Sequence, residues 1–354
     1  MGGHADAINC LDAISGRSML LSGSDDGSVR VWDVRALRCV IWFAGCSRPR
    51  FQNSPVNSVA VSASQENLLY TASGPSIFLF DLRMPVADQP LQSLVQVTAA
   101  SEYSLRGQDI SQISMHPRGS HLAAVDEGGR VSIVNIGPSN SKPKKQVIRL
   151  AARHEALASC VCWRGDPARS DAGIEPGRSN HIFTGGFDMK VLVHRLDQPF
   201  GHGAQTPITL AMNEPQDEPH PRRSTKAGGA FFGRRAAASG IRADGVPTIN
   251  PPFVHALDLT SDGQTLAVAC GDGTLRTYGL ELKMDGSVVE ILQQGLYQGH
   301  QLRTTCLALP HSSRQNRCFT GSDDRSLLLW DIETKSESEN HHTAVMSIDH
   351  GAKP

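Results

Sequence analysis

The chain has 354 residues, a formal net charge of −1, 39% hydrophobic residues and 19% charged residues. No apolar run approaches the ~18 uncharged residues of a membrane-spanning helix, which excludes a helical transmembrane protein. The near-zero charge gives no overall field that would attract nucleic acid or an acidic membrane surface, so we expect no membrane partner.

The N-terminus carries neither a basic region nor an apolar region of the kind found in secretory signals. The eight cysteines are dispersed along the chain. Without a signal peptide, such cysteines are typical of reduced thiols in an intracellular protein. The sequence therefore predicts a cytoplasmic and/or nuclear location.

The first repeated element begins with Gly3-His4 and continues with Leu20 to Asp33, which reads LLSGSDDGSVRVWD. It returns near the other end of the chain as Gly299-His300 followed by Cys318 to Asp331, which reads CFTGSDDRSLLLWD. Self-similarity of this kind is the sequence signature of repeat architectures.

Weaker copies fill the interval between these two. Each contains apolar residues at every second position, separated by clusters of Gly, Asp and Ser, which predicts short strands joined by tight turns. The sequence therefore predicts an all-β fold. The four weaker copies span residues 56–81, 110–135, 154–196 and 253–280.

A further short apolar run follows each copy and supplies a fourth strand per unit, at the ~40 to 45 residue spacing of a propeller blade. With its Gly-His and Trp-Asp pairs, the chain resembles the WD40 repeat family over essentially its full length. That resemblance implies one β-propeller domain, residues 1–354, with six visible four-stranded blades. The fourth-strand runs are residues 39–43, 91–97, 146–150, 207–212, 288–292 and 343–348.

Some features lie outside the generic motif and indicate a narrower likeness within this family. They are the opening Gly-Gly-His, Asp81-Leu-Arg83, Arg153-His154, the turn from Gly186 to Lys190, and the run from Ile348 to Gly351.

The ring of blades is expected to be incomplete. Gly3-His4 leaves no room for a preceding outer strand, and His350-Gly351 looks like the opening of a seventh copy. Propellers remove their sheet edges by closing on themselves. We therefore expect a seven-bladed ring that lacks its last blade, with a gap between the first and sixth blades. A closed six-bladed ring is the alternative.

Three residue types of a serine hydrolase, His, Ser and Asp, occur together in the first copy, so a catalytic triad must be considered. The same types recur at matching offsets in the fourth and sixth copies, whereas an active site is needed only once. We interpret the set as a hydrogen-bonded chain from Trp to Ser or Thr, His and Asp inside each blade, and resemblance to WD40 proteins implies the same. The residues are His4, Ser22, Asp26 and Trp32; His154, Thr184 and Asp188; and His300, Thr320, Asp324 and Trp330.

Other copies depart from this pattern. The fifth has Val268 and Tyr278 at the hydroxyl and Trp positions, and the second and third have Phe80 and Val134 at the Trp position. The copies that lack these side chains are expected to rely on packing alone.

Motifs for cofactors and metals are missing from the sequence. It contains no phosphate-binding G-x-x-x-x-G-K-[ST], no H-E-x-x-H and no C-x-x-C. Cys160 and Cys162 are better explained as small core residues than as metal ligands. His341-His342 with His350 is a weaker metal candidate in a linker-like stretch. We therefore predict no cofactor, no metal site and no enzymatic activity.

The first two copies end in the same four-residue pattern, an aromatic residue followed by Asp, a variable residue and Arg. The Asp and Arg are Asp33 and Arg35 in the first copy, and Asp81 and Arg83 in the second. This resembles the box of WD40 substrate receptors that dock on the damage-binding adaptor of cullin-4 ubiquitin ligases, where the Arg contacts the adaptor. The first copy matches the box throughout, and the second has Phe80 for Trp. The alternative is that exposed Arg at this turn only aids solubility.

Two insertions interrupt the repeats, residues 164–180 within the fourth blade and 198–252 between the fourth and fifth. The second holds six basic residues around Phe231-Phe232, a combination that can bind nucleic acid, but its composition favours a disordered loop. The function we predict is a monomeric protein-interaction scaffold, with a ligase receptor, a generic assembly scaffold and a nucleic-acid-associated protein as alternatives. The basic residues are Arg222, Arg223, Lys226, Arg234, Arg235 and Arg242.

Overall fold

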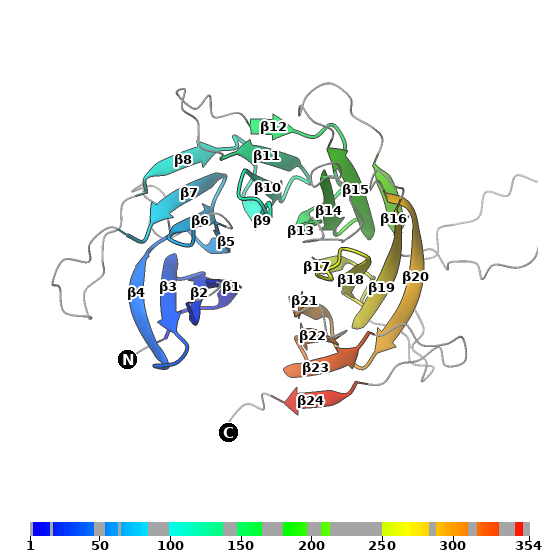
Figure 1. Ribbon diagram of the computed structural model, residues 1–354. Coiled ribbons are helices and arrows are strands. Elements are labelled where there is room, and N and C mark those ends of the chain that lie inside the picture. The colour runs from blue at the N-terminus through cyan, green and yellow to red at the C-terminus, as the bar shows by residue number, and fades with distance from the viewer. Residues whose placement is uncertain are drawn as a thin grey trace, which may run out of the picture.

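A computed structural model shows a propeller of six β-sheets arranged around a central axis (Figure 1). Residues 165–179 and 213–249 of the two predicted insertions, with all six basic residues named above, lie outside the described part of the chain. The structure describes residues 3–14, 17–45, 54–62, 65–83, 99–136, 147–164, 180–196, 207–212, 250–282, 288–310, 317–332 and 344–349.

The first three blades contain twelve strands. They are β1 (Ile8–Ile14), β2 (Met19–Ser24), β3 (Ser28–Asp33) and β4 (Arg38–Ala44); β5 (Val56–Val61), β6 (Leu68–Ser73), β7 (Ser76–Asp81) and β8 (Ser101–Ser104); and β9 (Ile110–Met115), β10 (His121–Asp126), β11 (Val131–Asn135) and β12 (Val147–Arg149).

The last three blades contain the other twelve. They are β13 (Ala158–Trp163), β14 (Asn180–Gly186), β15 (Lys190–Leu196) and β16 (Ile208–Ala211); β17 (Val254–Leu259), β18 (Thr265–Cys270), β19 (Thr274–Leu282) and β20 (Val288–Gln298); and β21 (Thr304–Ala308), β22 (Arg317–Ser322), β23 (Ser326–Asp331) and β24 (Met346–Asp349).

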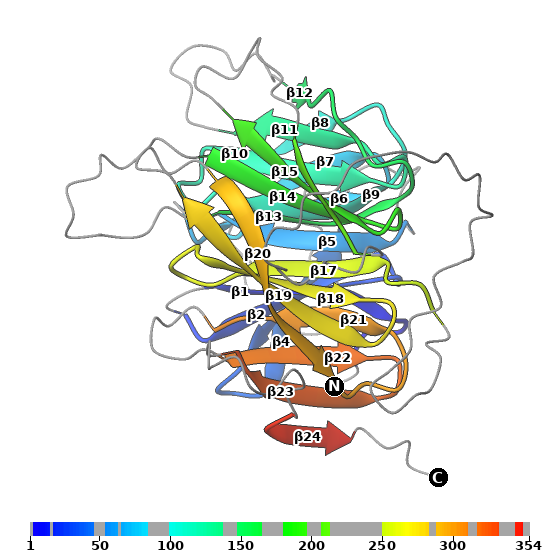
Figure 2. The same cartoon turned by 90° about the vertical axis from the view of Figure 1, so that its right-hand side faces the viewer.

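Each blade is an antiparallel meander in which strands consecutive in sequence are neighbours. Tight turns join the second and third strands, and in the first blade Gly27 adopts a φ of 74°, which glycine tolerates without strain. In the sixth blade Arg325 holds the equivalent position with a φ of 67°. Seen from the side, the strands run across the thickness of a disc and the loops gather on its two faces (Figure 2).

The core of the molecule lies between blades, because alternate side chains of each sheet face the two neighbouring blades. Five buried apolar clusters fill the five contacts between consecutive blades. The innermost strands also pack in order around the axis, β1 on β5, β5 on β9, β9 on β13, β13 on β17 and β17 on β21.

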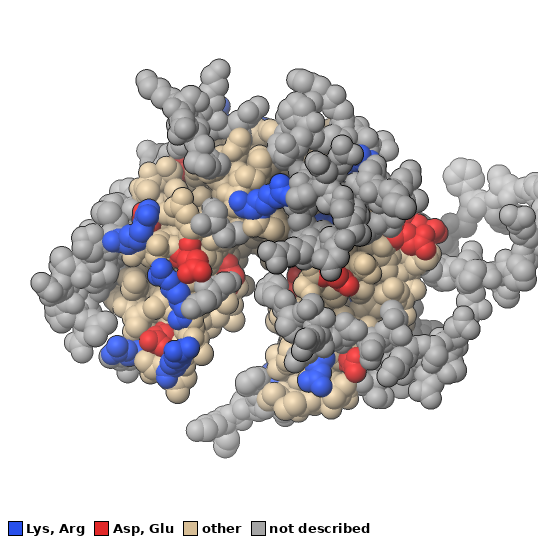
Figure 3. Space-filling view, in the orientation of Figure 1, with Lys and Arg blue, Asp and Glu red and all other residues tan. Residues whose placement is uncertain are grey.

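The prediction of an all-β propeller with six visible four-stranded blades is confirmed, and the ring is open. A gap separates the first blade from the sixth (Figure 1), and the same opening is visible between their side chains (Figure 3). Among the described residues, β21 does not pack on β1 as it does on β17. The residues expected to open a seventh copy, 350 and 351, lie outside the described part of the chain.

The outer strand of the second blade is not where the sequence placed it. Residues 91–97 lie outside the described residues, and β8 pairs with β7 instead. Tyr103 of β8 packs partly buried against the cluster between the second and third blades, which gives this short polar strand its anchoring contact. The range expected as an insertion, 198–252, also contains β16, in agreement with the separately predicted run 207–212.

Candidate functional site

The first blade brings four polar side chains together at one edge. His4 lies with Nδ1 at 2.9 Å from Asp26 Oδ2 and Nε2 at 2.7 Å from Ser22 Oγ, and Trp32 Nε1 donates to Ser22 Oγ at 2.8 Å. Asp26 also accepts hydrogen bonds from the backbone N–H groups of Ala5 and Ser28. These contacts tie the N-terminal segment to the β2–β3 turn.

The same arrangement recurs in the sixth blade. His300 lies 3.1 Å from Asp324 Oδ2 and 2.8 Å from Thr320 Oγ1, and Trp330 Nε1 donates to Thr320 at 2.7 Å. The same geometry thus occurs in two blades on opposite sides of the gap. Such repetition is typical of a network that stabilises each blade, and not of a single reaction centre.

In the fourth blade His194 stands in the Trp position. His154 lies 2.9 Å from Asp188 Oδ1 and 3.0 Å from Thr184 Oγ1, and His194 Nε2 lies 3.3 Å from the same Thr184 oxygen. This blade therefore closes its network with a second imidazole in place of an indole.

The carboxylates of these networks are held in the charged form. Desolvation by burial raises the pKa of Asp324, but hydrogen bonds from Ser326 and from the Gln301 N–H outweigh it and lower that pKa to about 2. The balance is the same for Asp26, whose pKa is also lowered, with Ser28, Ala5 and His4 as donors. A carboxylate that is fixed and fully hydrogen-bonded is a structural acceptor and a poor general base.

Acid should weaken the fold through His194. Burial, helped by the neighbouring His154, lowers the pKa of His194 to about 4, from 6.5 in an unfolded chain. Between these values the unfolded chain binds a proton that the folded chain does not, so stability falls as pH drops, by about 3 kcal/mol at most for this group. We expect His194→Gln, which keeps a donor near Thr184, to flatten the fall. Urea unfolding at pH values from 7 to 4 measures the free energy of unfolding of the unaltered chain and of His194→Gln. An equal fall in both chains would contradict the prediction.

The expectation that blades without the motif rely on packing alone is wrong for the fifth blade. Asp272 accepts a hydrogen bond from Thr274 at 2.6 Å and forms an ion pair with Arg276 Nη2 at 2.8 Å. Arg276 also donates to the carbonyl of Met212, which follows β16 of the fourth blade. Arg276 thus takes the place of the histidine and links two blades.

The second blade also has a polar contact that the sequence did not reveal. The hydroxyl of Thr71, in the position of Ser22, donates to the carbonyl of Gly45, which follows β4 of the first blade. A hydroxyl at this position is therefore satisfied by the preceding blade when no histidine is present.

The two boxes that end in Arg form Asp-capped turns after equivalent strands, β3 and β7. Asp33 Oδ1 accepts from the backbone N–H groups of Arg35 and Ala36, both at 2.9 Å, and Asp81 Oδ1 accepts from the N–H of Arg83 at 2.9 Å. Because β3 and β7 run in the same sense in adjacent blades, both arginines lie on the same face of the disc.

The two arginines differ in their contacts. The guanidinium of Arg83 is bound to Asp81, with Nη2 at 2.6 Å and Nε at 2.9 Å, and these hydrogen bonds lower the pKa of Asp81. The guanidinium of Arg35 is exposed and makes no hydrogen bond within the part of the chain that the structure describes. Arg35 is therefore the more available of the two for a partner.

Further basic side chains surround these boxes. Lys and Arg side chains gather over the first two blades on the left of Figure 3. Arg17 pairs with Glu66 across the contact between the two blades, at 3.2 Å. In the described part of the first two blades, the exposed arginines at this end of the strands are Arg17, Arg35, Arg38 and Arg83.

Four of the described cysteines are buried, namely Cys160, Cys162, Cys270 and Cys318. Cys160 and Cys162 are buried in the cluster between the fourth and fifth blades, and burial raises the pKa of the Cys160 thiol to about 12. Within the described residues no group of three or more His, Cys, Asp and Glu side chains is placed to hold a metal ion. The metal candidate at residues 341, 342 and 350 lies outside the described residues.

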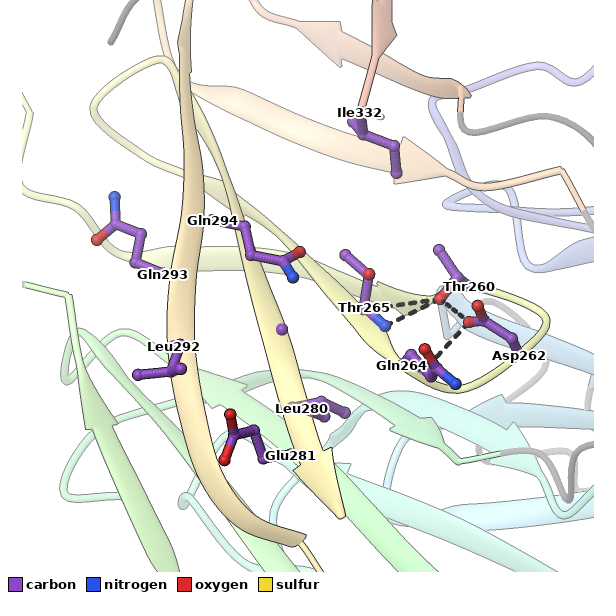
Figure 4. Close-up of a pocket in the computed structure, with 11 residues that line it drawn as sticks. Thr260, Asp262, Gln264, Thr265, Leu280, Glu281, Leu292, Gln293, Gln294 and Ile332 are labelled. Carbon is purple, nitrogen blue, oxygen red and sulfur yellow. Dashed lines mark hydrogen bonds between the residues drawn. The ribbon is translucent and has the colours of Figure 1, made fainter. Parts of the chain in front are cut away.

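A surface pocket of about 500 Å³ lies beside the fifth blade, between the ends of β18, β19 and β20 and Ile332 (Figure 4). Its polar wall is a closed turn, in which Thr260 Oγ1 donates to Asp262 at 2.6 Å and accepts from the N–H of Thr265 at 3.0 Å. Glu281 is its other carboxylate, and none of its lining residues is a histidine, cysteine or lysine. The Thr260 hydroxyl and the Asp262 carboxylate thus both take part in the hydrogen bonds that close this turn.

The sequence model described as "WD domain, G-beta repeat" matches residues 1–33 and 292–331. These ranges hold the first and last copies, in which the Trp, Ser or Thr, His and Asp contacts are complete. The chain is a WD40 β-propeller that carries WD40 repeats in its first and last copies. Propellers of this family are usually non-catalytic and bind proteins.

Two known proteins show how far the likeness extends. The WD repeat-containing protein 53 homolog of Dictyostelium discoideum is 23% identical over 98% of this chain and 79% of that protein. The narrower likeness indicated by the sequence was to WD repeat-containing protein 53, and this similarity confirms it. Ribosome biogenesis protein BOP1 of Homo sapiens is 31% identical, but over 35% of this chain and 19% of BOP1.

The fold also has a solved counterpart. The β-propeller domain of Cps50 (Swd1) from Myceliophteria thermophila superposes with a TM-score of 0.60 at 14% identity, covering 98% of this chain and 88% of that one. At this identity the likeness shows the fold alone. In the described part of the chain, no helix has the length and apolar character needed to cross a membrane.

Proposed function

We propose that the protein is a non-catalytic interaction scaffold whose first two blades dock an adaptor of the cullin-4 ubiquitin ligase type, which would make it a substrate receptor. The observation that supports this is the pair of Asp-capped turns, which present Arg35 and Arg83 on one face of adjacent blades. A charged side chain held above a rigid blade end recognises an acidic partner at little entropic cost.

Arg35 should carry most of the docking energy, because its guanidinium is exposed whereas that of Arg83 must first leave Asp81. We expect Arg35→Ala to weaken adaptor binding ~10- to 100-fold, the loss of one charge-assisted contact worth roughly 1.5–3 kcal/mol. Arg83→Ala should weaken it less. Titration of the purified chain against the purified adaptor measures both constants.

Arg38→Ala is the matched control, since it removes an exposed arginine at the same end of the first blade but outside the box. It should change the affinity less than threefold, and none of the three variants should lower the melting temperature. If the unaltered chain does not bind the adaptor at all, the generic assembly scaffold becomes the better account.

The absence of catalysis has its own test. Ser22 is 1% exposed and hydrogen-bonded to both His4 and Trp32. Ser22→Ala therefore removes the partner of the buried His4 imidazole and of the half-buried Trp32 indole. We expect it to lower the free energy of unfolding by ~1 to 3 kcal/mol and to abolish no activity. A hydrolase activity that disappears in a folded Ser22→Ala chain would contradict the scaffold proposal. Assays with ester and peptide substrates, paired with a melting curve, separate the two outcomes.

A further inference from the structure

The fifth blade differs from the other blades in its two outer strands. β19 and β20 have 9 and 11 residues, whereas the outermost strands of the other five blades have three to seven. The pairing of β18 with β19 ends at Thr265 opposite Gly279, but that of β19 with β20 continues to Leu282 opposite Val288. The two outer strands therefore form a hairpin that extends past the rest of their sheet.

One side of this hairpin is covered by the fourth blade. Leu280 is 6% exposed in the cluster between the fourth and fifth blades, and Ile291 packs against that cluster. Successive side chains of a strand point to opposite sides. The other side of the hairpin, which carries Glu281, Glu290 and Leu292, is therefore turned away from the fourth blade. All three of these side chains are exposed, Leu292 at 45%.

The two glutamates on the uncovered side stand directly opposite each other, because Glu281 of β19 and Glu290 of β20 are register partners. Residues in this relation have Cβ atoms about 4.5–5.5 Å apart, and like charges there are destabilising. Neither carboxylate has a hydrogen bond or an ion pair among the described residues. A cation bound between these two like charges would therefore relieve their repulsion.

The uncovered side of the hairpin continues into the surface pocket of about 500 Å³, whose lining includes Glu281 and Leu292 (Figure 4). Gly279 keeps this surface concave, because a Cβ at that position would overlap the amide of Gln294. Gln294 is the extra residue of a bulge in β20, and bulges often redirect a side chain in this way. The lining contains the carboxylates of Asp262 and Glu281 and no Lys, Arg or His. The pocket is therefore suited to a positively charged group.

β20 is also the edge strand of its sheet, and an edge strand directs the N–H and C=O groups of every second residue away from the sheet. Proteins often protect such edges with Lys or Pro, and β20 contains neither. Its stretch from Glu290 to Gln293 pairs regularly with β19 between two bulges. We propose that this edge docks an extended, basic segment of a partner protein, which adds to β20 as a fifth strand and places an Arg or Lys side chain between Glu281 and Glu290.

The spacing of strands fits such an occupant. A strand added to the sheet lies about 4.8 Å beyond β20, and its side chains on the pocket side stand next to Glu290 and Leu292. Glu281 is one strand further away, within reach of a long basic side chain. A second copy of this chain is a poor occupant, because pairing of β20 with β20 would bring further glutamates to the same edge. The proposal goes beyond adaptor docking, which uses the first two blades, and is independent of it.

The experiment titrates the 354-residue chain with a labelled synthetic peptide that alternates valine and arginine. We expect a one-to-one complex that is at least tenfold weaker with the double variant Glu281→Gln and Glu290→Gln. The matched control is Asp109→Asn with Glu127→Gln, which removes two exposed carboxylates from the third blade and should change the affinity less than twofold. All four side chains are exposed, so circular dichroism melts should show folded chains.

Two further readouts test the strand pairing itself. N-methylation of alternate peptide N–H groups removes backbone donors but keeps the charges, and should also weaken binding at least tenfold. Amide hydrogen exchange should show that the peptide protects β20 between Glu290 and Gln293.

Four results would overturn the proposal. One is equal binding to the unaltered chain and to the Glu281→Gln, Glu290→Gln chain. Another is equal binding by a peptide that alternates valine and glutamate, or by the N-methylated peptide. The third is a dimer of the chain alone in which the β20 amides are protected, since a second copy would then be the occupant. The fourth is no protection of β20 even when the peptide is tethered by a flexible linker, which raises its effective concentration to the millimolar range.

Discussion

Trp330→Ala should be among the most destabilising single substitutions in the chain, at about 3–5 kcal/mol, while Trp32→Ala should cost about half as much. The two residues hold the same place in the same motif, and each donates to a hydroxyl oxygen. Trp330 is fully buried and packs edge-on against Tyr297 of the fifth blade, with ring centroids 5.7 Å apart. Trp32 belongs to the first blade, which borders the gap in the ring, and is half-buried.

Urea unfolding followed by far-UV circular dichroism compares the two variants, since removal of either indole changes the fluorescence. Phe319→Ala serves as a control at an apolar side chain that no blade covers, and should cost less than either. Equal losses for the two tryptophans would mean that the side of the first blade that borders the gap is covered in solution, and the open ring would be wrong.

The propeller could be predicted because its determinants are local. Alternating apolar residues specify strands, and the Ser-Asp-Asp turn with its following Trp-Asp marks the second and third strands of a blade. The His-Asp contacts follow from the same repetition, since Ser22 and Thr320 share their offsets to Asp and Trp. Local signals of this kind survive in a single sequence.

The outer strand of the second blade could not be predicted for a physical reason. The run from Leu91 to Val97 is more apolar than β8, so the pattern of hydrophobic residues predicted the strand there and not at β8. An outer strand is held mainly by backbone hydrogen bonds to its one neighbour, which carry no side-chain signature. One contact, that of the Tyr103 ring, fixes the strand that the structure uses.

The ion pair of Arg276 was missed because sequence comparison looks for the same residue at the same place. Here the partner of the turn aspartate comes from the following strand, and Asn250 stands at the offset that the histidines have in the other blades. A signal was present, since Arg276 lies two residues after Thr274 and so on the same side of β19, facing Asp272. The ion pair between Asp81 and Arg83 was also missed. The sequence analysis considered Arg83 only as a contact for a partner protein and not as a partner of Asp81.

Arg276→Leu should destabilise the fold by about 3–5 kcal/mol, because it leaves the carboxylate of Asp272 buried without its cation. The side chains of Arg276 and Asp272 are 15% and 7% exposed, and Asp272 keeps only its hydrogen bonds with Thr274 once the guanidinium is gone. The carbonyl of Met212 also loses its donor, so the contact between the fourth and fifth blades weakens with it. Thermal and urea unfolding give the loss.

The double variant Arg276→Leu with Asp272→Asn separates the buried charge from the lost packing. It removes the unpaired charge and keeps an acceptor for Thr274, so it should recover a large part of the loss, as buried ion pairs replaced together are often near neutral. Arg303→Leu is the surface control, since Arg303 and Asp323 form an ion pair at 55% and 37% exposure, and should cost within ~1 kcal/mol. A double variant no more stable than Arg276→Leu would show that the arginine acts through the Met212 contact alone.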